Sequence, residues 1–385
     1  MLNLDKNNKV LVFFTLFVYS FALPNLRFAV GNFTIPPTVL FILLLGFFLV
    51  KLKNIKLDVY KFNALFLLFI SVVALSGVIN QQDETLLFLF KLLFCQLIFL
   101  LTYKLLELNF DKLKLFLLVG LFSSFSLLIH MYASYYILGS PYLSGSLSIV
   151  TEQGKNQIAA YLAIMSVIFF CTIYCAPQQN KKNFFVFFLI HFIGLIYSFS
   201  RSALICTLIA IFCFLMLRNQ GFLKKLKQVF IVSLIVVSGS IILLPFLPEV
   251  IVDSLESNII SIIEFQDSGD STSISKRTEM IYLALELFEE NIIIGSGAMS
   301  FYHKAGIASH NTFLQILSEF GILGLLSFLA FYCYALFISL KRNIYFFPAL
   351  LCFFFTMFFQ NVLDLMFLYV IFAFAFLNGE EYVRS

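Results

Sequence analysis

Charged side chains are scarce in this sequence. Only 12% of the 385 residues are Asp, Glu, Lys or Arg, whereas 61% are hydrophobic and 52 are Phe. Soluble domains contain about 25% charged residues, so an ordinary soluble fold is excluded. The net charge of +4 does not indicate nucleic-acid binding, because the basic residues stand in short clusters between apolar runs. The composition predicts a polytopic membrane protein.

Common metal, nucleotide and redox motifs are also missing. The sequence contains no G-x-x-x-x-G-K-[ST], C-x-x-C or H-E-x-x-H motif. All seven cysteines fall inside apolar runs, so they provide no framework for extracytoplasmic disulfides. No compact cluster of His and carboxylate residues has the spacing of metal ligands. We therefore expect neither a metal site nor a cofactor.

The sequence does contain many apolar runs that are long enough to cross a bilayer, which requires about 20 residues. We predict an all-α membrane protein with about 12 transmembrane helices. The first run could be mistaken for a signal peptide, but Pro24 and Asn25 give a poor cleavage site, and we interpret it as a retained span. The expected spans lie at 10–30, 34–50, 62–79, 85–103, 113–137, 156–176, 184–200, 201–217, 229–247, 311–340, 344–360 and 361–378.

The distribution of Lys and Arg orients these spans. Eighteen of the 25 lie on one side, six lie on the other, and Lys91 lies within a span. Cytoplasmic loops are enriched in basic residues, so both termini are predicted to be cytoplasmic. The run 184–217 is too long for one helix and has basic residues at both ends, which makes it a hairpin with its tip, residues 198–202, on the outer face. By the same argument residues 343–379 form a hairpin, with its outer tip near Gln360, Asn361 and Asp364.

The predicted topology divides the chain into three parts. Residues 1–247 hold nine spans, residues 248–310 form a long outer loop, and residues 311–385 hold three spans and a short cytoplasmic tail. The loop has ten acidic and three basic residues, so it can hold an anion only through particular bases. Its stretch 264–276 is expected to be flexible. An amphipathic helix, opened by Arg277 and lying on the membrane surface, is predicted from the spacing of Met280, Leu283, Ala284, Leu287 and Phe288.

Ionisable residues near the spans are the candidates for function, because each costs free energy unless it is paired or faces water. Arg201, at the tip of the hairpin, is either a phosphate-binding guanidinium or an interfacial anchor that snorkels. His310 precedes Asn311, the predicted N-cap of the tenth span. It is either a general base toward a sugar hydroxyl or a solvated loop residue, with His303 as a weaker rival. Glu319 is expected to be paired or to face a cavity within the membrane.

Two other readings of the polar residues remain open. A transporter without catalysis could line its path with Lys91, His130, His191, Glu319 and Asp364. A scaffold is the third class, although it gives no reason for an Arg at an outer hairpin tip. Gly321 and Gly324 are interpreted as close-packing positions between helices.

Several short motifs occur in a fixed order between residues 198 and 325. They are Ser200–Leu204 (SRSAL), Lys276–Thr278 (KRT), Asn291–Gly297 (NIIIGSG), Ser309–Gln315 (SHNTFLQ) and Ser318–Gly324 (SEFGILG). In this order they resemble the bacterial O-antigen ligase and O-antigen polymerase (Wzy-type) superfamily. Gly154–Gln157 is similar to an earlier Asn-containing turn of that family. One departure is Asn291–Ile293, which lacks the Pro that usually precedes the glycines.

The resemblance implies a GT-C-like glycosyltransferase of the bacterial inner membrane with a periplasmic active site. Its donor would be an undecaprenyl-diphosphate-linked glycan, without nucleotide sugar or metal. Arg201 and Arg277 would hold the diphosphate, His310 would deprotonate the acceptor hydroxyl for inverting attack, and Asn311, Glu319 and Asn156 would support them. Membrane lipid, a chain-length regulator and a flippase are the implied partners.

Within the superfamily, the polymerase joins lipid-linked repeat units, whereas the ligase moves the finished polymer onto lipid A-core. Both need the same Arg, Arg and His chemistry. We favour the polymerase, because the chain is short and Phe-rich with a compact loop.

Overall fold

The computed structural model describes residues 28–30, 33–35, 56–82, 84–107, 111–132, 155–198, 200–217, 271–307, 309–361, 363 and 366–378. Within these ranges the regular secondary structure is helical, except for a small antiparallel hairpin of β1 (Phe28–Val30) and β2 (Phe33–Ile35). The strands occupy the end of the first predicted span, 10–30, and the start of the second, 34–50, so these two boundaries are wrong. The register pairs Val30 with Phe33, and the Gly-Asn dipeptide between them in sequence favours a tight hairpin. The rest of these two spans, and the span predicted at 229–247, lie outside the described residues.

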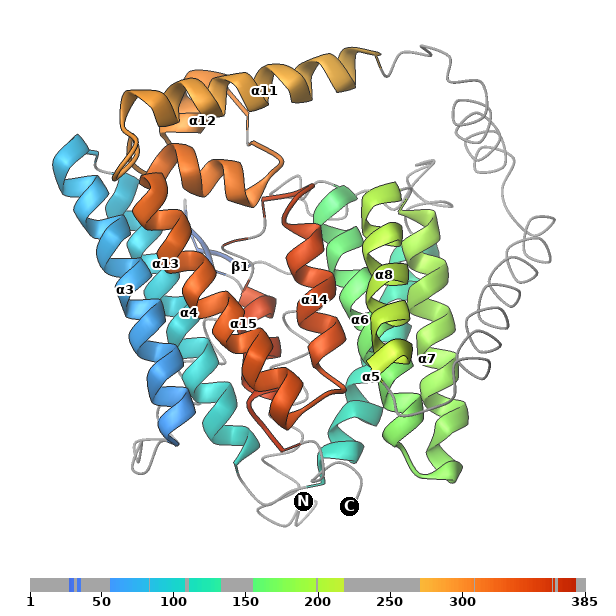
Figure 1. Cartoon of the computed structure of the whole chain (residues 1–385). Helices are drawn as coiled ribbons and strands as arrows, with labels where there is room; N and C mark the ends of the chain where they lie inside the picture. The colour runs from blue at the N-terminus through green and yellow to red at the C-terminus, as the bar shows by residue number, and fades with distance from the viewer. Residues whose placement is uncertain are drawn as a thin grey trace.

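The other predicted spans correspond to a bundle of helices (Figure 1). Among the described helices, α3, α4, α5, α6 and α13 are long and apolar enough to cross a membrane. A break between α7 and α8 falls at the predicted hairpin tip. This part of the chain is a multi-pass helical membrane protein. The helices are α3 (Leu57–Asn80), α4 (Glu84–Leu106), α5 (Lys112–Tyr132), α6 (Lys155–Cys175), α7 (Gln178–Tyr197), α8 (Arg201–Leu217), α13 (Thr312–Arg342), α14 (Phe347–Thr356) and α15 (Met366–Ala375).

Helices α14 and α15 are shorter than the spans predicted at 344–360 and 361–378. Each has 10 residues. The chain leaves the helix after Thr356 and turns over residues 357–360, where two of its carbonyl groups accept hydrogen bonds from the start of α13. Thr312 donates to both, from its amide to Met357 O at 2.9 Å and from its hydroxyl to Gln360 O at 2.7 Å. Contact with another helix therefore supplies partners for this turn, which hydropathy alone does not reveal.

Phenylalanine fills the space between α3, α4, α13 and α15. The ring centroid of Phe62 lies 4.6 Å from that of Phe99, 5.9 Å from that of Phe331 and 5.2 Å from that of Phe372. Tilted and edge-to-face ring pairs each contribute about 0.5–1.5 kcal/mol beyond the area they bury. Because lipid is as apolar as these side chains, close packing rather than water exclusion holds such helices together.

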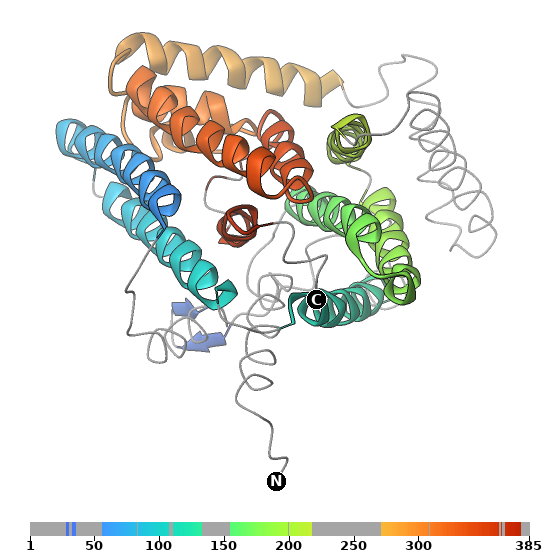
Figure 2. The same cartoon turned by 60° about the horizontal axis from the view of Figure 1, so that its bottom comes forward.

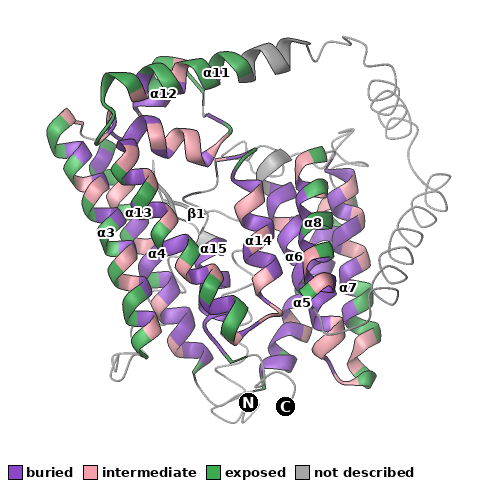
Figure 3. Cartoon of the chain, viewed as in Figure 1, coloured by how far each residue is buried: buried purple, intermediate pink, exposed green. Residues whose placement is uncertain are grey.

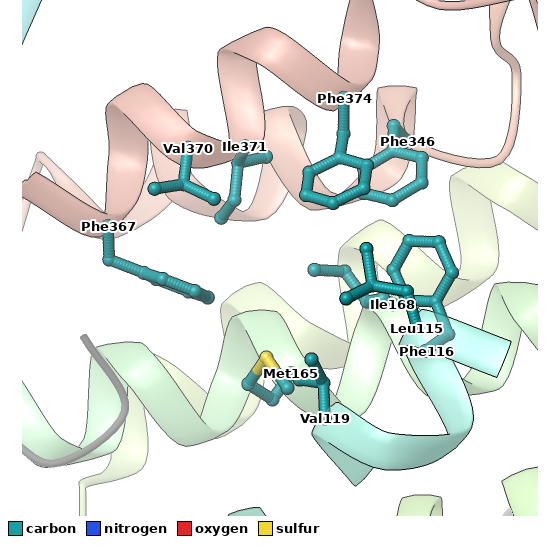
Figure 4. A pocket seen from close by; sticks show the side chains of 10 residues that line it. All are labelled: Leu115, Phe116, Val119, Met165, Ile168, Phe346, Phe367, Val370, Ile371 and Phe374. Atoms are coloured by element: carbon teal, nitrogen blue, oxygen red, sulfur yellow. The ribbon is translucent and has the colours of Figure 1, made fainter. Parts of the chain in front are cut away.

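A small apolar cavity lies between α5, α6, α15 and the start of α14 (Figure 4). Met165 of α6, Val119 of α5 and Phe367 of α15 are among its lining residues. Every side chain that lines it is apolar. The cavity therefore offers no group that could bind a sugar or a phosphate.

The two ends of the bundle differ in charge. Arg342, at the end of α13, pairs with Asp58 at the start of α3. The same end of the bundle carries Lys56, Lys61, Lys104, Lys112, Lys114, Lys181, Lys182 and Lys341. The opposite end carries α11 (Ser271–Glu290) and α12 (Ser300–Ala305) (Figure 1). We call it the outer end, because the positive-inside rule predicts that the basic end is cytoplasmic.

Helices α11 and α12 form a layer over the outer end (Figures 1 and 2). Met280, Ala284 and Leu287 of α11 form a second buried cluster with Phe301 of α12, against which Leu314 of α13 packs. A helix is thus present where amphipathic spacing predicts it. Its apolar face, however, packs on protein and not on a membrane surface, because Phe301 and Leu314 supply the apolar area that this face needs. The face turned away from the bundle is exposed (Figure 3).

Two details of this layer also differ from the prediction. Helix α11 begins at Ser271, so part of the stretch predicted to be flexible is helical and Arg277 does not open the helix. Lys304 of α12 donates to Glu286 and Glu290 of α11, each at 3.1 Å, and joins the two helices. The bond to Glu286 and then the bond to Glu290 raise the pKa of Lys304, because the two carboxylates stabilise its ammonium.

Candidate functional site at the outer end

Helix α13 is broken at Gly321. The backbone of this residue has φ 63° and ψ −164°, a conformation that essentially only glycine adopts. The break leaves the last carbonyl groups before Gly321 and the first amide groups after it without their helical partners. Buried backbone groups of this kind need other hydrogen bonds.

The turn that follows α11 supplies these bonds. Two of its amides donate to carbonyls before the break, and two of its carbonyls accept from amides after it. A single loop therefore caps both halves of α13. The four pairs are Ser296 N with Ser318 O at 3.0 Å, Gly297 N with Glu319 O at 2.8 Å, Ile322 N with Ile292 O at 2.9 Å and Leu323 N with Ile293 O at 3.2 Å.

The motif glycines make this contact sterically feasible. A Cβ at Gly295, where φ is +70°, would lie 2.3 Å from the backbone carbonyl carbon of Glu319. A Cβ at Gly321 would lie 2.5 Å from the carbonyl group of Ile293. The interpretation of Gly321 as a packing position between helices is therefore wrong. Gly321 instead interrupts α13 and contacts the loop that follows α11. Gly324 faces Phe320 across the same break.

The end of α3 supports the loop from the other side. Ser76 donates to Glu319 O at 3.0 Å, Asn80 donates to Gly295 O at 3.0 Å, and the amide of Gln82 donates to Ser296 O at 2.9 Å. These side chains lie more than 200 residues from their partners and belong to no motif, so the sequence does not mark them. Polar residues at the end of an otherwise apolar helix were the available signal.

Glu319 is hydrogen-bonded, as a buried carboxyl group must be. Its side chain is 1% exposed and accepts from the amide of Gln315 at 3.2 Å. The backbone amides of Met299 and Phe301 also hydrogen-bond to it. Glu319 therefore fastens the start of α12 to α13.

Replacement of Glu319 by Ala is expected to loosen the outer layer. It would leave buried donors without an acceptor, at a cost of roughly 1–3 kcal/mol each. We expect a lower thermal unfolding temperature in detergent and faster proteolysis within residues 298–307. Glu289→Ala, on the exposed face of α11, is the matched control. Equal unfolding temperatures for the two variants would contradict this assignment.

His310 is exposed and lies on a backbone that is held on both sides. Its φ is 52°, in the left-handed region. Asn311 is the N-cap of α13, as the sequence predicts: its side chain accepts from Phe313 N at 2.9 Å and Leu314 N at 3.0 Å. The same side chain donates to Phe358 O, 3.1 Å away, in the turn after α14. These contacts place His310 firmly at the outer end.

A chain of side-chain contacts connects the neighbour of His310 to Glu319. The hydroxyl of Ser309 lies 2.8 Å from Asn311 O and 3.3 Å from the side-chain oxygen of Gln315. The amide nitrogen of Gln315 then donates to Glu319. The buried carboxyl group and the exposed His310 thus belong to one hydrogen-bonded segment.

Arg201 shares the outer end with His310. It is the first residue of α8 and is exposed. Helix α8 packs on α14, and the thiol of Cys206 hydrogen-bonds to the side chain of Thr356 at the end of α14. At 1.5 Å per residue along α8, Arg201 lies about 7.5 Å closer to the outer end than Cys206 does. Since Thr312 is bonded to the turn directly after Thr356, the end of α14 joins the elements that carry Arg201 and His310.

The other predicted site residues lie in different positions. Arg277 lies in α11, whose amino-terminal end extends from α12 toward the side of the molecule that holds α8 (Figures 1 and 2). Asn156 lies in the first turn of α6, so the expected loop turn is helical there. The rival histidine, His303, has its Nε2 3.2 Å from a carboxylate oxygen of Glu84 and joins α12 to α4.

The polar residues of the predicted transport path lie in unlike surroundings. Lys91 is exposed on α4. His191 is fully buried, its Nδ1 lies 2.9 Å from Phe187 O, and its ring centroid lies 5.0 Å from that of Phe169. Glu319 is part of the outer layer, and Asp364 lies outside the described residues. His130 is half-buried near the end of α5. In the part of the chain that the structure describes, no group of three His, Cys, Asp or Glu residues could hold a metal ion.

The described elements define a class: a multi-pass helical membrane protein whose outer layer braces a broken helix and holds His310 and Arg201 at one end. Residues 184–329 match the family model described as O-Antigen ligase. The match runs from α7 through the break in α13 and includes the motifs of the outer layer. It confirms the resemblance to the O-antigen ligase and polymerase superfamily. A comparison with curated proteins found no match.

Proposed function

We propose that this protein is a polymerase of O-antigen or a related surface polysaccharide. It would join undecaprenyl-diphosphate-linked repeat units as an inverting, metal-independent glycosyltransferase at the periplasmic face of a bacterial inner membrane. The observation that carries the proposal is His310, exposed on a braced backbone at the end of the bundle that also holds Arg201. The family match over residues 184–329 supports a glycosyltransferase.

In the proposed reaction, neutral His310 removes the proton from the acceptor hydroxyl. The hydroxyl oxygen attacks the anomeric carbon of the donor sugar while the bond from that carbon to the diphosphate oxygen breaks. The electron pair of this bond leaves with the diphosphate. Arg201 and Arg277 hold that group and offset its growing charge, since a guanidinium binds phosphate oxygens in pairs and stays ionised.

Lipid-linked substrates account for the architecture. A polyprenyl chain remains in the bilayer and reaches the site between helices, while its diphosphate and glycan stay at the outer surface. A site at the end of the bundle, and not deep within it, suits such a molecule. A flippase that delivers the units and a chain-length regulator are the partners that we propose.

The polymerase and the ligase differ in acceptor, so the products in cells separate them. We expect cells that lack the protein to place a single repeat unit on lipid A-core. Lipid A-core without any repeat unit, together with accumulated lipid-linked polymer, would instead identify a ligase. Repeat units that accumulate on the cytoplasmic side would identify a transporter.

Substitution of Asn311 tests whether its contact with the turn after α14 positions the neighbouring His310. In Asn311→Ala, loss of the N-cap should cost about 1 kcal/mol of stability, and we expect at least a tenfold lower rate of polymer formation. Asn311→Ser keeps the cap but loses the bond to Phe358, so it should be more stable than Asn311→Ala and still slower than wild type. The rate of polymer formation and the unfolding temperature of purified protein measure the two effects. Wild-type rates in both variants would show that the turn after α14 does not position His310.

A further inference from the structure

Gln360 is a buried carboxamide without a hydrogen bond. Its side chain is 3% exposed, and neither its Oε1 nor its Nε2 has a partner in the described structure. The other fully described buried carboxamides each make at least one bond: Gln96 donates to Asn63 Oδ1 at 3.3 Å, and Asn343 donates to Phe374 O at 3.1 Å. Gln360 therefore differs from the amides that hold the bundle together.

Such a position is unfavourable for folding. Each buried polar atom without a partner loses its hydrogen bonds to water and gains none in return. An unbranched apolar side chain would fill the same space at lower cost. Because the carboxamide makes no bond in its covered position, rotation of the side chain outward breaks none. A role in binding explains a Gln here better than a role in packing.

The location of Gln360 associates it with His310. Its carbonyl oxygen accepts from the hydroxyl of Thr312 at 2.7 Å, two residues after His310. The preceding residues of the turn, Phe358 and Phe359, are 46% and 40% exposed, so Gln360 lies just beneath the surface of the outer end. Arg201 starts the helix that packs on α14. The turn that carries Gln360 is thus bonded to the chain two residues after His310, the group that would activate the acceptor.

We propose that Gln360 is a glycan-binding residue of this site. Its Oε1 accepts from one hydroxyl of the acceptor sugar and its Nε2 donates to a neighbouring hydroxyl, which orients the attacking hydroxyl toward His310. A carboxamide offers one acceptor beside two donors, and this suits adjacent sugar hydroxyls, each of which donates and accepts. The inference rests on the proposed function and names the part of the substrate that the turn after α14 recognises.

The test uses the full-length protein in detergent and lipid-linked repeat units isolated from cells that lack it. Polymer formation is measured in the presence of increasing amounts of free repeat-unit oligosaccharide. This oligosaccharide has been released from its lipid, so it competes with the acceptor through glycan contacts alone. In Gln360→Leu we expect the inhibition constant of this oligosaccharide to rise about five- to thirtyfold, as for the loss of two hydrogen bonds. The unfolding temperature should stay the same or rise.

Gln96→Leu is the matched control. It should lower the unfolding temperature, because Asn63 loses a donor, and leave the inhibition constant unchanged. An unchanged inhibition constant in Gln360→Leu would overturn the inference, and a lower unfolding temperature in addition would give Gln360 a structural role. If His310→Ala retained full activity, the proposed function itself would be overturned, so the two failures are distinguishable.

Discussion

A His310→Ala variant should make little or no polymer. Without its general base, the acceptor hydroxyl would have to lose its proton to water, and we expect the rate of transfer to fall about a hundred- to ten-thousand-fold. Surface polysaccharide from cells that lack the native protein and carry the variant should then show a single repeat unit on lipid A-core, whereas wild type should restore a ladder. Lipid-linked repeat units should accumulate in the same cells.

His303→Ala is the matched control for this result. Both histidines are exposed at the outer end, but His303 contacts Glu84 and joins α12 to α4. Its replacement should remove only a contact at the surface, which is worth little. We expect a normal ladder. A normal ladder from His310→Ala as well would remove the catalytic role of His310 and favour a function without catalysis.

The second large effect is expected on folding. Gly295→Ala should destabilise the outer end severely, because its Cβ would lie 2.3 Å from the backbone of Glu319 and backbone atoms cannot move aside cheaply. Left-handed geometry adds roughly 1–2 kcal/mol, and overpacking adds about 1–3 kcal/mol. Separation of the loop from α13 would free four backbone hydrogen bonds and release the segment that carries His310. We expect little purified protein, with a much lower unfolding temperature and no activity.

Gly306→Ala isolates the contribution of that close approach. Gly306 has φ +72°, nearly the same as Gly295 at +70°, but a Cβ there would meet nothing within 4 Å. Both variants incur the left-handed strain, and only Gly295→Ala incurs the clash. The unfolding temperature should therefore fall several times further in Gly295→Ala. Equal falls would mean that the loop is not clamped to α13 as the structure shows.

The hydrogen bonds between the loop after α11 and the two halves of α13 explain why the motifs contain glycine. The glycines of NIIIGSG and SEFGILG carry no chemistry of their own, yet they allow two backbone segments to meet. Glu319 then ties the start of α12 to the same helix. These contacts hold the backbone of His310 at the outer end, so residues with no direct role in transfer should still be required for activity.

Much of the bundle follows from the sequence alone. Apolar length and the positions of Lys and Arg locate the helices from α3 to α8, the break between α7 and α8, and the start of α13 at its Asn311 cap. These features are determined locally, because bilayer thickness dictates helix length and an N-cap bonds within its own first turn. The order of the motifs likewise indicates the superfamily that residues 184–329 match.

Only the tertiary structure decided how the outer end is built. The break at Gly321, the early end of α14, the cover over the apolar face of α11 and the burial of Gln360 all depend on segments distant in sequence. Ser76, for example, bonds to Glu319 of α13 and Asn80 to Gly295 of the loop, each more than 200 residues away. Hydropathy and spacing record whether a segment is apolar or helical, but not which backbone groups will find partners on another segment. For that physical reason, the sequence alone determined the spans and the candidate chemistry, and the tertiary structure determined the arrangement that holds His310 in place.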